Sequence, residues 1–339
     1  MADKMPAREF FVGIDSYIWY ISGRQTARDV FVDDAGNLLE APPAYSPDEL
    51  YKRLDKITGF AKSLRPPDDS DMSSGNVEAG GNADAPVVIM TPLNAGYTAT
   101  LPKYLTRCYD DGEITETIKT YIGGLGAEGS NIFYADLTAG FSGSDIPLYY
   151  RTDHHWNGDG AYLAYTALGD ALGFTPLPKN NFSIEEYGGF YGSTYAKSGL
   201  WFTRPDTIAM WSPPVPVLVS VTDAGKEPDV RESLFFNEYL SDWDMYSVFL
   251  GGIHGLTVID NLDGNQNGKT LFIIKDSYAN SLIPLLVPHF DRIVVVDLRY
   301  YRESVSELYG ELHSSDDDAL LFIYSMNHMV NDPDMMWLR

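Results

Sequence analysis

The sequence predicts an α/β protein in which helices cover both faces of a mainly parallel β-sheet. Stretches with helical spacing of apolar residues separate short apolar, β-branched segments. Strands that alternate with helices in this way form parallel sheets, and such strands are apolar because both of their faces are buried. The expected strands are 87–91, 132–137, 271–274, 293–297 and 319–324, and the expected helices are 114–122, 161–172, a segment after Ser277, and 304–312.

The first 64 residues predict a strand or turn, a second turn and then a helix. Residues 10–17 indicate the strand or turn, and 33–37, Asp-Asp-Ala-Gly-Asn, is a turn signal. The helix is expected from Ser46, because Ser46-Pro47-Asp48-Glu49 is a capping box with proline at the first helical position. Its apolar residues, Leu50, Leu54, Ile57, Ala61 and Leu64, follow at helical spacing.

Two segments are expected to interrupt this alternation. Residues 66–86 are mostly Pro, Asp, Ser, Gly, Asn and Ala, which predicts an exposed or mobile loop. Residues 176–268 predict an irregular insertion on the sheet, with strands at 215–221 and 256–260. No internal repeat is present, and we expect a single domain over residues 1–339.

Composition narrows the classes of partner. The chain has 24 Lys and Arg against 48 Asp and Glu, and its net charge of −24 repels phosphate backbones and anionic lipid headgroups, which argues against nucleic acid. The single cysteine, Cys108, excludes an internal disulfide, and we expect it to be a buried structural thiol. No apolar run reaches the roughly 18 to 20 residues of a membrane span, so no integral membrane segment is expected.

Candidate catalytic residues lie in two distant stretches. Asp153, His154 and His155 precede the helix at 161–172, for which Asn157 is the expected cap and Gly173 the expected stop. A histidine titrates near neutral pH, and a carboxylate can hold it in one tautomer. A nucleophile must come from elsewhere. Ser277 is the candidate because it follows an apolar strand at a strand-to-helix turn, where backbone N–H groups can bind an oxyanion.

These motifs resemble those of a known family. The sequence is similar to the bacterial DHHW proteins, which themselves resemble SGNH (GDSL-type) hydrolases and alginate O-acetyltransferases. The resemblance covers most of the chain. It rests on Tyr149-Tyr150-Arg151-Thr152-Asp153-His154-His155-Trp156, Lys275-Asp276-Ser277-Tyr278, Asp297-Leu298-Arg299-Tyr300-Tyr301, Pro92, Leu101-Pro102 and Phe190-Tyr191-Gly192-Ser193-Thr194.

The resemblance implies a three-layer α/β/α, SGNH-hydrolase-like domain with a flavodoxin-like parallel sheet, circularly permuted and with a middle insertion. In that order Ser277 follows the first strand, Asn327 the third, and Asp153 and His155 the fifth. All three positions then lie at the carboxyl edge of one sheet, where α/β proteins place their sites.

The resemblance also implies roles for these residues. Ser277 would attack an acyl ester, His155 would take and return the proton, and Asp153 would orient His155. The Ser277 N–H and the Asn327 side chain would stabilise the oxyanion, with Arg299 as a possible substitute for either donor. Lys275 stands where the GDSL motif has glycine, so it either screens developing negative charge or is solvated or paired. His154 is expected to bond locally and Trp156 to be buried.

The expected activity is that of an esterase or O-acyltransferase. It would act on small acyl esters, above all acetyl, of cell-envelope or secreted polysaccharide, with no cofactor and no metal. The expected partners are an acylated polysaccharide or an acyl donor. An extracytoplasmic location follows from the resemblance, with a signal or anchor upstream of position 1.

Two alternatives stay open. One is a non-catalytic carbohydrate-binding or envelope-assembly protein on the same fold, favoured because no glycine follows Asp297 at an expected oxyanion position. The other is a metal-dependent phosphoesterase, because Asp-His-His and Gly251-Gly252-Ile253-His254 superficially match such enzymes. The first 86 residues contain no histidine to complete that metal site.

Overall fold

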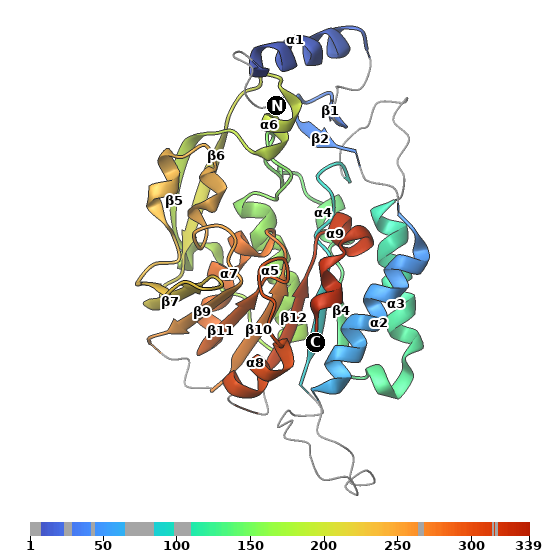
Figure 1. Cartoon of the computed structure of the whole chain (residues 1–339), viewed down its shortest axis with the longest axis vertical. Coiled ribbons are helices and arrows are strands. Elements are labelled where there is room, and N and C mark those ends of the chain that lie inside the picture. Colours follow the sequence, from blue (N-terminus) through green and yellow to red (C-terminus); the bar gives the residue numbers. More distant parts are fainter. Residues whose placement is uncertain are drawn as a thin grey trace, which may run out of the picture.

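The computed structural model of the protein describes residues 8–23, 29–41, 45–64, 85–97, 110–263, 268–313, 315 and 318–339. An eight-stranded sheet forms its centre (Figure 1). In spatial order the strands are β4 (Ile132–Ala135), β3 (Val87–Met90), β12 (Ala319–Ile323), β10 (Thr270–Lys275), β11 (Arg292–Val296), β9 (Leu256–Asn261), β7 (Val217–Thr222) and β8 (Asp229–Arg231).

The first five strands of this order form the parallel part of the sheet. Each of them pairs in parallel with its neighbours from β4 to β11. Counted from β10, their spatial order is 2-1-3-4-5, which is the flavodoxin-like order. The circular permutation predicted from the order of the motifs is confirmed. All six residues of β10 are buried, as expected for a central strand covered on both faces.

The remaining three strands come from the stretch predicted to be irregular. Strands β9, β7 and β8 continue the sheet in antiparallel pairing beyond β11. Burial alternates along β7 and β9, so one of their faces is less covered than the faces of β10. The same stretch holds the antiparallel hairpin of β5 (Ser183–Phe190) and β6 (Asp206–Ser212). Residues 176–268 are thus more regular than their sequence indicates.

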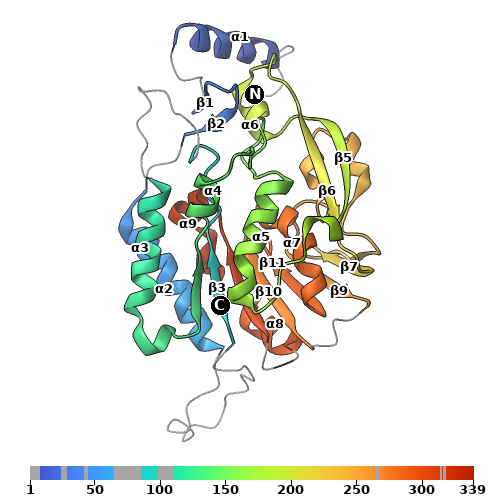
Figure 2. The ribbon, with the colours of Figure 1, turned by 180° about the vertical axis from the view of Figure 1, so that it is seen from behind.

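Helices cover both faces of the parallel strands. On one face lie α2 (Pro47–Ser63), α8 (Val305–Leu312) and α9 (Met326–Asn331), and on the opposite face lie α5 (Gly158–Leu172) and α7 (Ala279–Leu286) (Figures 1 and 2). Phe60 of α2 meets Phe322 of β12 edge to face, and Tyr309 of α8 packs on Phe272 of β10. Two further helices, α3 (Asp111–Gly124) and α4 (Thr138–Ser142), flank β4 in the chain.

The helix boundaries follow most of the predicted signals. The Asn157 side chain accepts a hydrogen bond from the Gly160 N–H at the start of α5, and Gly173 ends that helix in the left-handed region at φ +72°. Pro47 begins α2 as predicted, but the Ser46 side chain makes no capping hydrogen bond. The capping box therefore marks the correct boundary without forming its bond.

The expected strand or turn at 10–17 is wrong, because these residues lie in helix α1 (Arg8–Ile21). The helical spacing of Phe11, Ile14, Ile18 and Ile21 becomes visible only over the whole segment, and these four side chains are exposed. The turn predicted at 33–37 joins β1 (Val30–Val32) to β2 (Leu38–Glu40). With α6 (Ser193–Ser198), these elements lie beyond one end of the central sheet (Figure 1).

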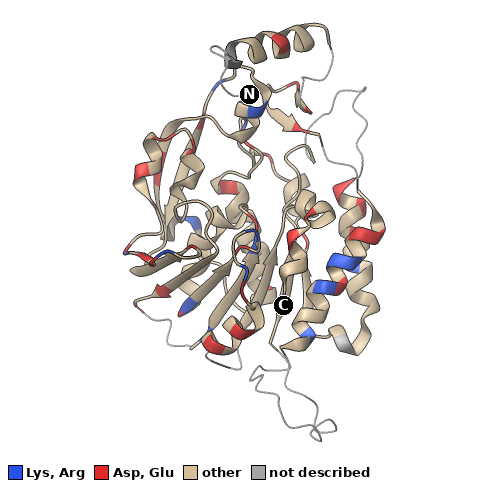
Figure 3. Ribbon diagram, in the orientation of Figure 1, with Lys and Arg blue, Asp and Glu red and all other residues tan. Residues whose placement is uncertain are grey.

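Several expectations fall outside the described residues. These concern Cys108, Leu101-Pro102 and almost all of the predicted loop, since residues 65–84 are not described. Among the described helices, none has both the length and the apolar character that crossing a membrane requires. Asp and Glu residues are distributed over elements such as α3, α8 and β5 rather than gathered on one element (Figure 3).

Gly160 tests the contact between the Asp153 loop and α5. A Cβ atom at this position would overlap the Leu148 carbonyl oxygen, which is backbone and cannot rotate away. Gly160→Ala should therefore destabilise the protein by about 1–3 kcal/mol in urea unfolding, as overpacking does. Gly123→Ala in α3 is the matched control, since a Cβ there meets nothing within 4 Å. Equal stability of the two variants would show that the loop can move away.

Candidate active site

Ser277 lies at a turn between the central strand and a helix. Strand β10 ends at Lys275 and α7 begins at Ala279. The buried Asp276 carboxylate accepts hydrogen bonds from the N–H groups of Tyr278 (3.0 Å) and Ser325 (2.7 Å), which fixes the turn against the end of β12. Within the described part of the chain, the Ser277 N–H has no intramolecular acceptor. Ser277 is half-buried, so both its hydroxyl and its N–H can face a ligand.

The loop that carries Asp153 is anchored on both sides. Tyr149 and Trp156 form an antiparallel bridge at its base, and Trp156 is fully buried, as predicted. The Trp156 indole N–H donates to Ser281 Oγ of α7 (3.0 Å), which ties the loop to the helix that follows Ser277. The Asp206 carboxylate accepts the N–H groups of residues 151 and 152 at 2.9 and 2.8 Å. The loop therefore has little freedom to move relative to Ser277.

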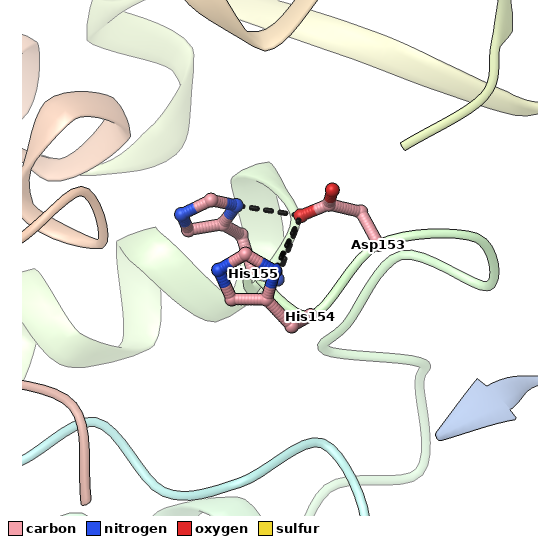
Figure 4. Close-up of side chains that lie close together, drawn as sticks. All are labelled: Asp153, His154 and His155. Carbon is pink, nitrogen blue, oxygen red and sulfur yellow. Dashed lines mark hydrogen bonds and ion pairs between the residues drawn. The ribbon is translucent and has the colours of Figure 1, made fainter. Parts of the chain in front are cut away.

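Three side chains form a continuous hydrogen-bonded chain. Asp153 Oδ1 lies 2.5 Å from His155 Nδ1, and His155 Nε2 lies 2.8 Å from Ser277 Oγ. The same Asp153 oxygen accepts the His155 backbone N–H at 2.9 Å. Figure 4 shows the carboxylate of Asp153 facing both imidazole rings of the loop. With Nδ1–H donated to the carboxylate, Nε2 is the acceptor for the serine proton, which is the arrangement a general base requires.

Aromatic rings hold the His155 imidazole in place. Tyr246 stacks on it with ring centroids 3.9 Å apart and planes inclined by 7°, and Tyr278 packs at 4.9 Å. The Tyr246 hydroxyl donates to Ser281 Oγ (3.1 Å), and the Tyr278 hydroxyl donates to the His154 carbonyl (2.5 Å). Burial raises the pKa of Tyr246 well above its usual value, so this ring stays neutral.

The second oxygen of Asp153 is also occupied. Asp153 Oδ2 accepts hydrogen bonds from Ser193 N (2.7 Å) and Ser193 Oγ (2.9 Å). Burial alone would raise the pKa of Asp153, but the charges of His155 and His154 and the hydrogen bonds from His155 outweigh it and hold the pKa well below the usual range. His154 bonds to Ser193 Oγ through Nδ1 (2.8 Å), and burial together with His155 lowers the pKa of His154. Asp153 is thus a fixed anion beside a neutral His154.

Lys275 and Arg299 belong to a buried ionic network beside the site. Lys275 Nζ donates to Asn280 Oδ1 (2.7 Å) and lies 3.4 Å from Asp297 Oδ2, and its side chain is 3% exposed. Arg299 forms a two-pronged contact with Asp297 through Nε (2.9 Å) and one terminal nitrogen (2.6 Å). Asn280 in turn donates to the Gly252 carbonyl (2.8 Å). Lys275 is therefore paired rather than solvated.

A cavity of about 700 Å³ opens above these residues. Ser277, His155, Asp153 and Arg299 line it, whereas Asn327, half-buried on α9, is not among its lining residues. The sequence indicated Asn327 as an oxyanion donor in a turn, yet the structure places His328 at the cavity instead. Other lining side chains that the sequence did not single out are Tyr191, Ser193, Trp243, Tyr246 and Asn280.

Only part of this lining could have been found from the sequence. Ser193 falls within Phe190-Tyr191-Gly192-Ser193-Thr194, a motif used above only for the resemblance. Ser325 and His328 are separated by three positions after a strand, as a helix cap and a first-turn residue are, and the Ser325 side chain does accept the His328 N–H. Trp243 and Tyr246 carry no local signal, because the fold of the 176–268 stretch brings them to the cavity.

The Asp153 loop also has the composition of a metal site. Potential ligand atoms of Asp153, His154 and His155 lie within 4.8 Å of one another. Both ring nitrogens of His155 are already engaged, by Asp153 and by Ser277. A metal bound by His155 would have to replace one of these hydrogen bonds, so ligation by His155 and an intact Asp-His-Ser chain are mutually exclusive.

The permuted flavodoxin-like sheet, with a serine after its first strand and an Asp-x-His loop after its fifth, defines the class of SGNH-like α/β proteins. Within that class, residues 133–296 match the sequence profile of the DHHW protein family. The resemblance predicted from the motifs is therefore confirmed. No functionally curated protein has significant sequence similarity to this chain.

Solved structures show the same fold. A DHHW family protein from Eubacterium siraeum is 21% identical, with a TM-score of 0.74 over 92% of this chain and 95% of that chain. PatB1 from Bacillus cereus, solved with a sulfonyl adduct, is 18% identical, with a TM-score of 0.68 over 91% and 98% of the two chains. The O-acetyltransferase domain of Pseudomonas putida AlgJ matches at a TM-score of 0.44 and 13% identity, too weakly to bear on activity.

Gly192 tests the placement of the Asp153 carboxylate. A Cβ atom at Gly192 would overlap Asp153 Cβ and Oδ2, so Gly192→Ala should displace the carboxylate and misalign His155. We expect Ser277 to react with an arylsulfonyl fluoride about 10²-fold more slowly, the scale of loss for a misplacement near 1 Å. Mass spectrometry of the labelled serine measures this rate. Gly188→Ala, where a Cβ meets nothing within 4 Å, is the control; equal rates in both variants would contradict the expectation.

Proposed function

We propose that the protein is a serine esterase or O-acyltransferase that acts on small acyl esters through an acyl-serine intermediate. The observation that carries this proposal is the continuous Asp153–His155–Ser277 chain, with bond lengths of 2.5 and 2.8 Å, at the wall of a large cavity. The bond between His155 and Ser277 joins two segments that are 122 positions apart in the chain. Neither bond of the chain is part of a helix or of a strand pairing. Their geometry is that of a nucleophile, a base and an orienting carboxylate.

The proposed reaction has two halves. Ser277 Oγ attacks the carbonyl carbon while its proton passes to His155 Nε2, and Asp153 stabilises the resulting imidazolium. The tetrahedral intermediate collapses when the C–O bond to the leaving alcohol breaks and that alcohol takes the proton from His155. In the second half, water or a sugar hydroxyl gives its proton to His155 and attacks the acyl-Ser277 carbonyl. Breakage of the serine ester bond then returns the proton to Ser277.

The oxyanion needs donors close to Ser277. The Ser277 N–H is one, since it has no acceptor among the described residues. Arg299 lines the cavity and adds positive charge, although it is held by Asp297. Asn327 is the weaker of the predicted donors, because it lies outside the cavity lining.

Two aromatic side chains on the cavity wall support a carbohydrate substrate. Trp243 is 84% exposed and Tyr191 is 37% exposed, and both line the cavity that holds Ser277. Flat aromatic faces with a polar edge suit the apolar faces of sugar rings. The sulfonyl adduct of the structurally similar PatB1 fits the same proposal, since sulfonyl reagents trap activated nucleophiles. We therefore propose acylated polysaccharide as substrate, with an extracytoplasmic site of action.

The second candidate function is carbohydrate binding without catalysis. The exposed Trp243 favours it as much as it favours an enzyme, because stacking on sugars requires no nucleophile. The two functions differ in whether Ser277 is needed, which makes the serine the residue to change first.

Ser277→Ala should abolish hydrolysis of p-nitrophenyl acetate, lowering the rate by several orders of magnitude because a covalent nucleophile is lost. Only one hydroxyl is removed, so the free energy of unfolding should fall by at most about 0.5–1.5 kcal/mol. His155→Ala should match Ser277→Ala, whereas His154→Ala should have a milder effect. A chelator should leave the wild-type rate unchanged. Glycan binding by a wild-type protein that is inert toward acyl donors would instead support the non-catalytic function.

Trp243→Ala should weaken the use of an acetylated oligosaccharide. Loss of one stacking contact of about 0.5–1.5 kcal/mol corresponds to about a 2- to 12-fold fall in kcat/KM. The fall should be smaller for p-nitrophenyl acetate, which is too small to reach the cavity rim. Phe202→Ala is the matched control, because Phe202 is 86% exposed but does not line this cavity. Equal effects of the two substitutions on the oligosaccharide would refute the role of Trp243.

A further inference from the structure

A second histidine reaches the cavity next to Ser277. His328 lies in α9, directly after β12, and β12 pairs in parallel with β10 so that Ile323 is beside Lys275. The turns after these two strands therefore meet at one edge of the sheet. The Ser325 N–H donates to Asp276 Oδ2 (2.7 Å), which joins the start of α9 to the Ser277 turn.

His328 is paired with a buried carboxylate. Its Nδ1 lies 2.6 Å from Asp276 Oδ2 and 3.2 Å from Ser325 Oγ. Asp276 is 1% exposed, whereas the His328 side chain is 37% exposed and lines the same cavity as Ser277. Because the Nδ1 edge of the ring is held by the buried carboxylate, Nε2 is the nitrogen left for the cavity. Among the described residues, no hydrogen-bond partner of this nitrogen is found.

The site thus contains two Asp–His pairs of the same construction. In each, a buried carboxylate binds Nδ1 of the imidazole, at 2.5 Å for Asp153 and His155 and at 2.6 Å for Asp276 and His328. The first pair directs Nε2 at Ser277 Oγ. In the second pair the carboxylate is that of Asp276, which directly precedes Ser277 in the chain. The Nε2 atom of His328 has no hydrogen-bond partner among the described residues. This nitrogen is therefore available to a ligand that enters the cavity.

The charge of His328 decides whether it can donate from Nε2. The charged groups that act on it are Asp276, Asp332 and Arg299. Burial lowers the pKa of His328, but the hydrogen bond and charge of Asp276, helped by Asp332, outweigh burial and Arg299, and the pKa lies above its usual value. The protonated ring carries a hydrogen on Nε2 as well as on Nδ1.

We propose that His328 is a further catalytic residue, whose Nε2–H donates to the acyl carbonyl oxygen as this oxygen becomes an anion. This inference rests on the proposed function. His328 and the Ser277 N–H then provide two donors, and His328 takes the place predicted for the Asn327 amide. Arg299 is less suited, because two of its nitrogens are committed to Asp297. No proton leaves His328, and the proton transfers all pass through His155.

The first test is the rate of p-nitrophenyl acetate hydrolysis. His328→Ala should lower kcat/KM about 10²- to 10³-fold, as expected when one oxyanion donor is removed. His328→Gln, which retains a neutral N–H donor, should recover part of that loss. The matched control is His313→Gln, which alters another Asp–His pair, with Asp318, that does not line the cavity. Thermal unfolding of each variant shows whether it folds. If His328→Ala does not fold, the rate of His328→Gln tests the inference instead.

The second test is the pH dependence. Because the protonated ring is the active form, wild-type kcat/KM should fall as pH rises through the pKa of His328. This fall should be absent from His328→Gln, because the glutamine amide does not titrate. Ring-carbon NMR signals, with His328→Gln for assignment, should show His328 titrating above its usual value of 6.5.

The outcomes separate this inference from the proposed function. If Ser277→Ala is inactive and His328→Ala stays within about threefold of wild type, the inference is overturned and the serine mechanism stands. Loss of activity in Asn327→Ala but not in His328→Ala overturns it as well, and so does a fall in kcat/KM with rising pH that persists unchanged in His328→Gln. A wild-type protein that is inert toward acyl esters overturns the proposed function, and the inference with it.

Discussion

The bond between Ser277 Oγ and His155 Nε2 joins residues 122 positions apart, and the topology of the sheet makes that contact possible. Strand β10 lies between β11 and β12 in the parallel part of the sheet, so its carboxyl end is flanked by theirs. The loop after β4 must cross toward this point, because β4 is at the edge of the sheet. It does so between Tyr149 and Trp156, and the bond of Trp156 to Ser281 fixes its final position. A 2.8 Å contact over this separation requires such anchoring at both ends.

Buried carboxylates gather at the same edge of the sheet. Asp153, Asp276 and Asp297 are each at most 2% exposed. Burial of a charge costs several kcal/mol unless partners compensate. Each carboxylate has a cationic or imidazole partner and at least one backbone N–H donor. An apolar core would fold at lower cost, so these networks are best understood as a means of fixing side chains whose positions matter for chemistry.

The sequence predicts the parallel strands, the cap of α5 at Asn157 and the permuted order, because local periodicity and motif order carry this information. It does not predict which side chains of α9 face the cavity. The side chains of successive helix residues point in directions about 100° apart, so Asn327 and His328 lie on different faces of α9. Helix α1 is not predicted for a different reason. Its apolar residues are exposed, and a short window of them does not distinguish a helix from a strand.

The two Asp–His pairs have similar internal geometry and different surroundings. The His155 ring lies against Tyr246 and Tyr278, and its carboxylate partner Asp153 also accepts hydrogen bonds from Ser193. Because the Nδ1 edge of the ring faces Asp153, Nε2 is the acceptor for Ser277. His328 lies at the cavity wall, where Asp276 and Asp332 favour its charged form. Environments that separate two otherwise equivalent groups in this way assign one to base chemistry and the other to stabilisation of negative charge.

In the proposed mechanism this assignment is the same for hydrolysis and for acyl transfer, because both reactions would pass through the same acyl-Ser277. What distinguishes them is the occupant of the cavity when that intermediate is attacked. Trp243 and Tyr191, which line the cavity, come from the stretch between the two halves of the permuted sheet. In the proposed function the parallel sheet and its edge therefore supply the catalytic side chains, and residues 176–268 supply side chains that would select the acyl acceptor.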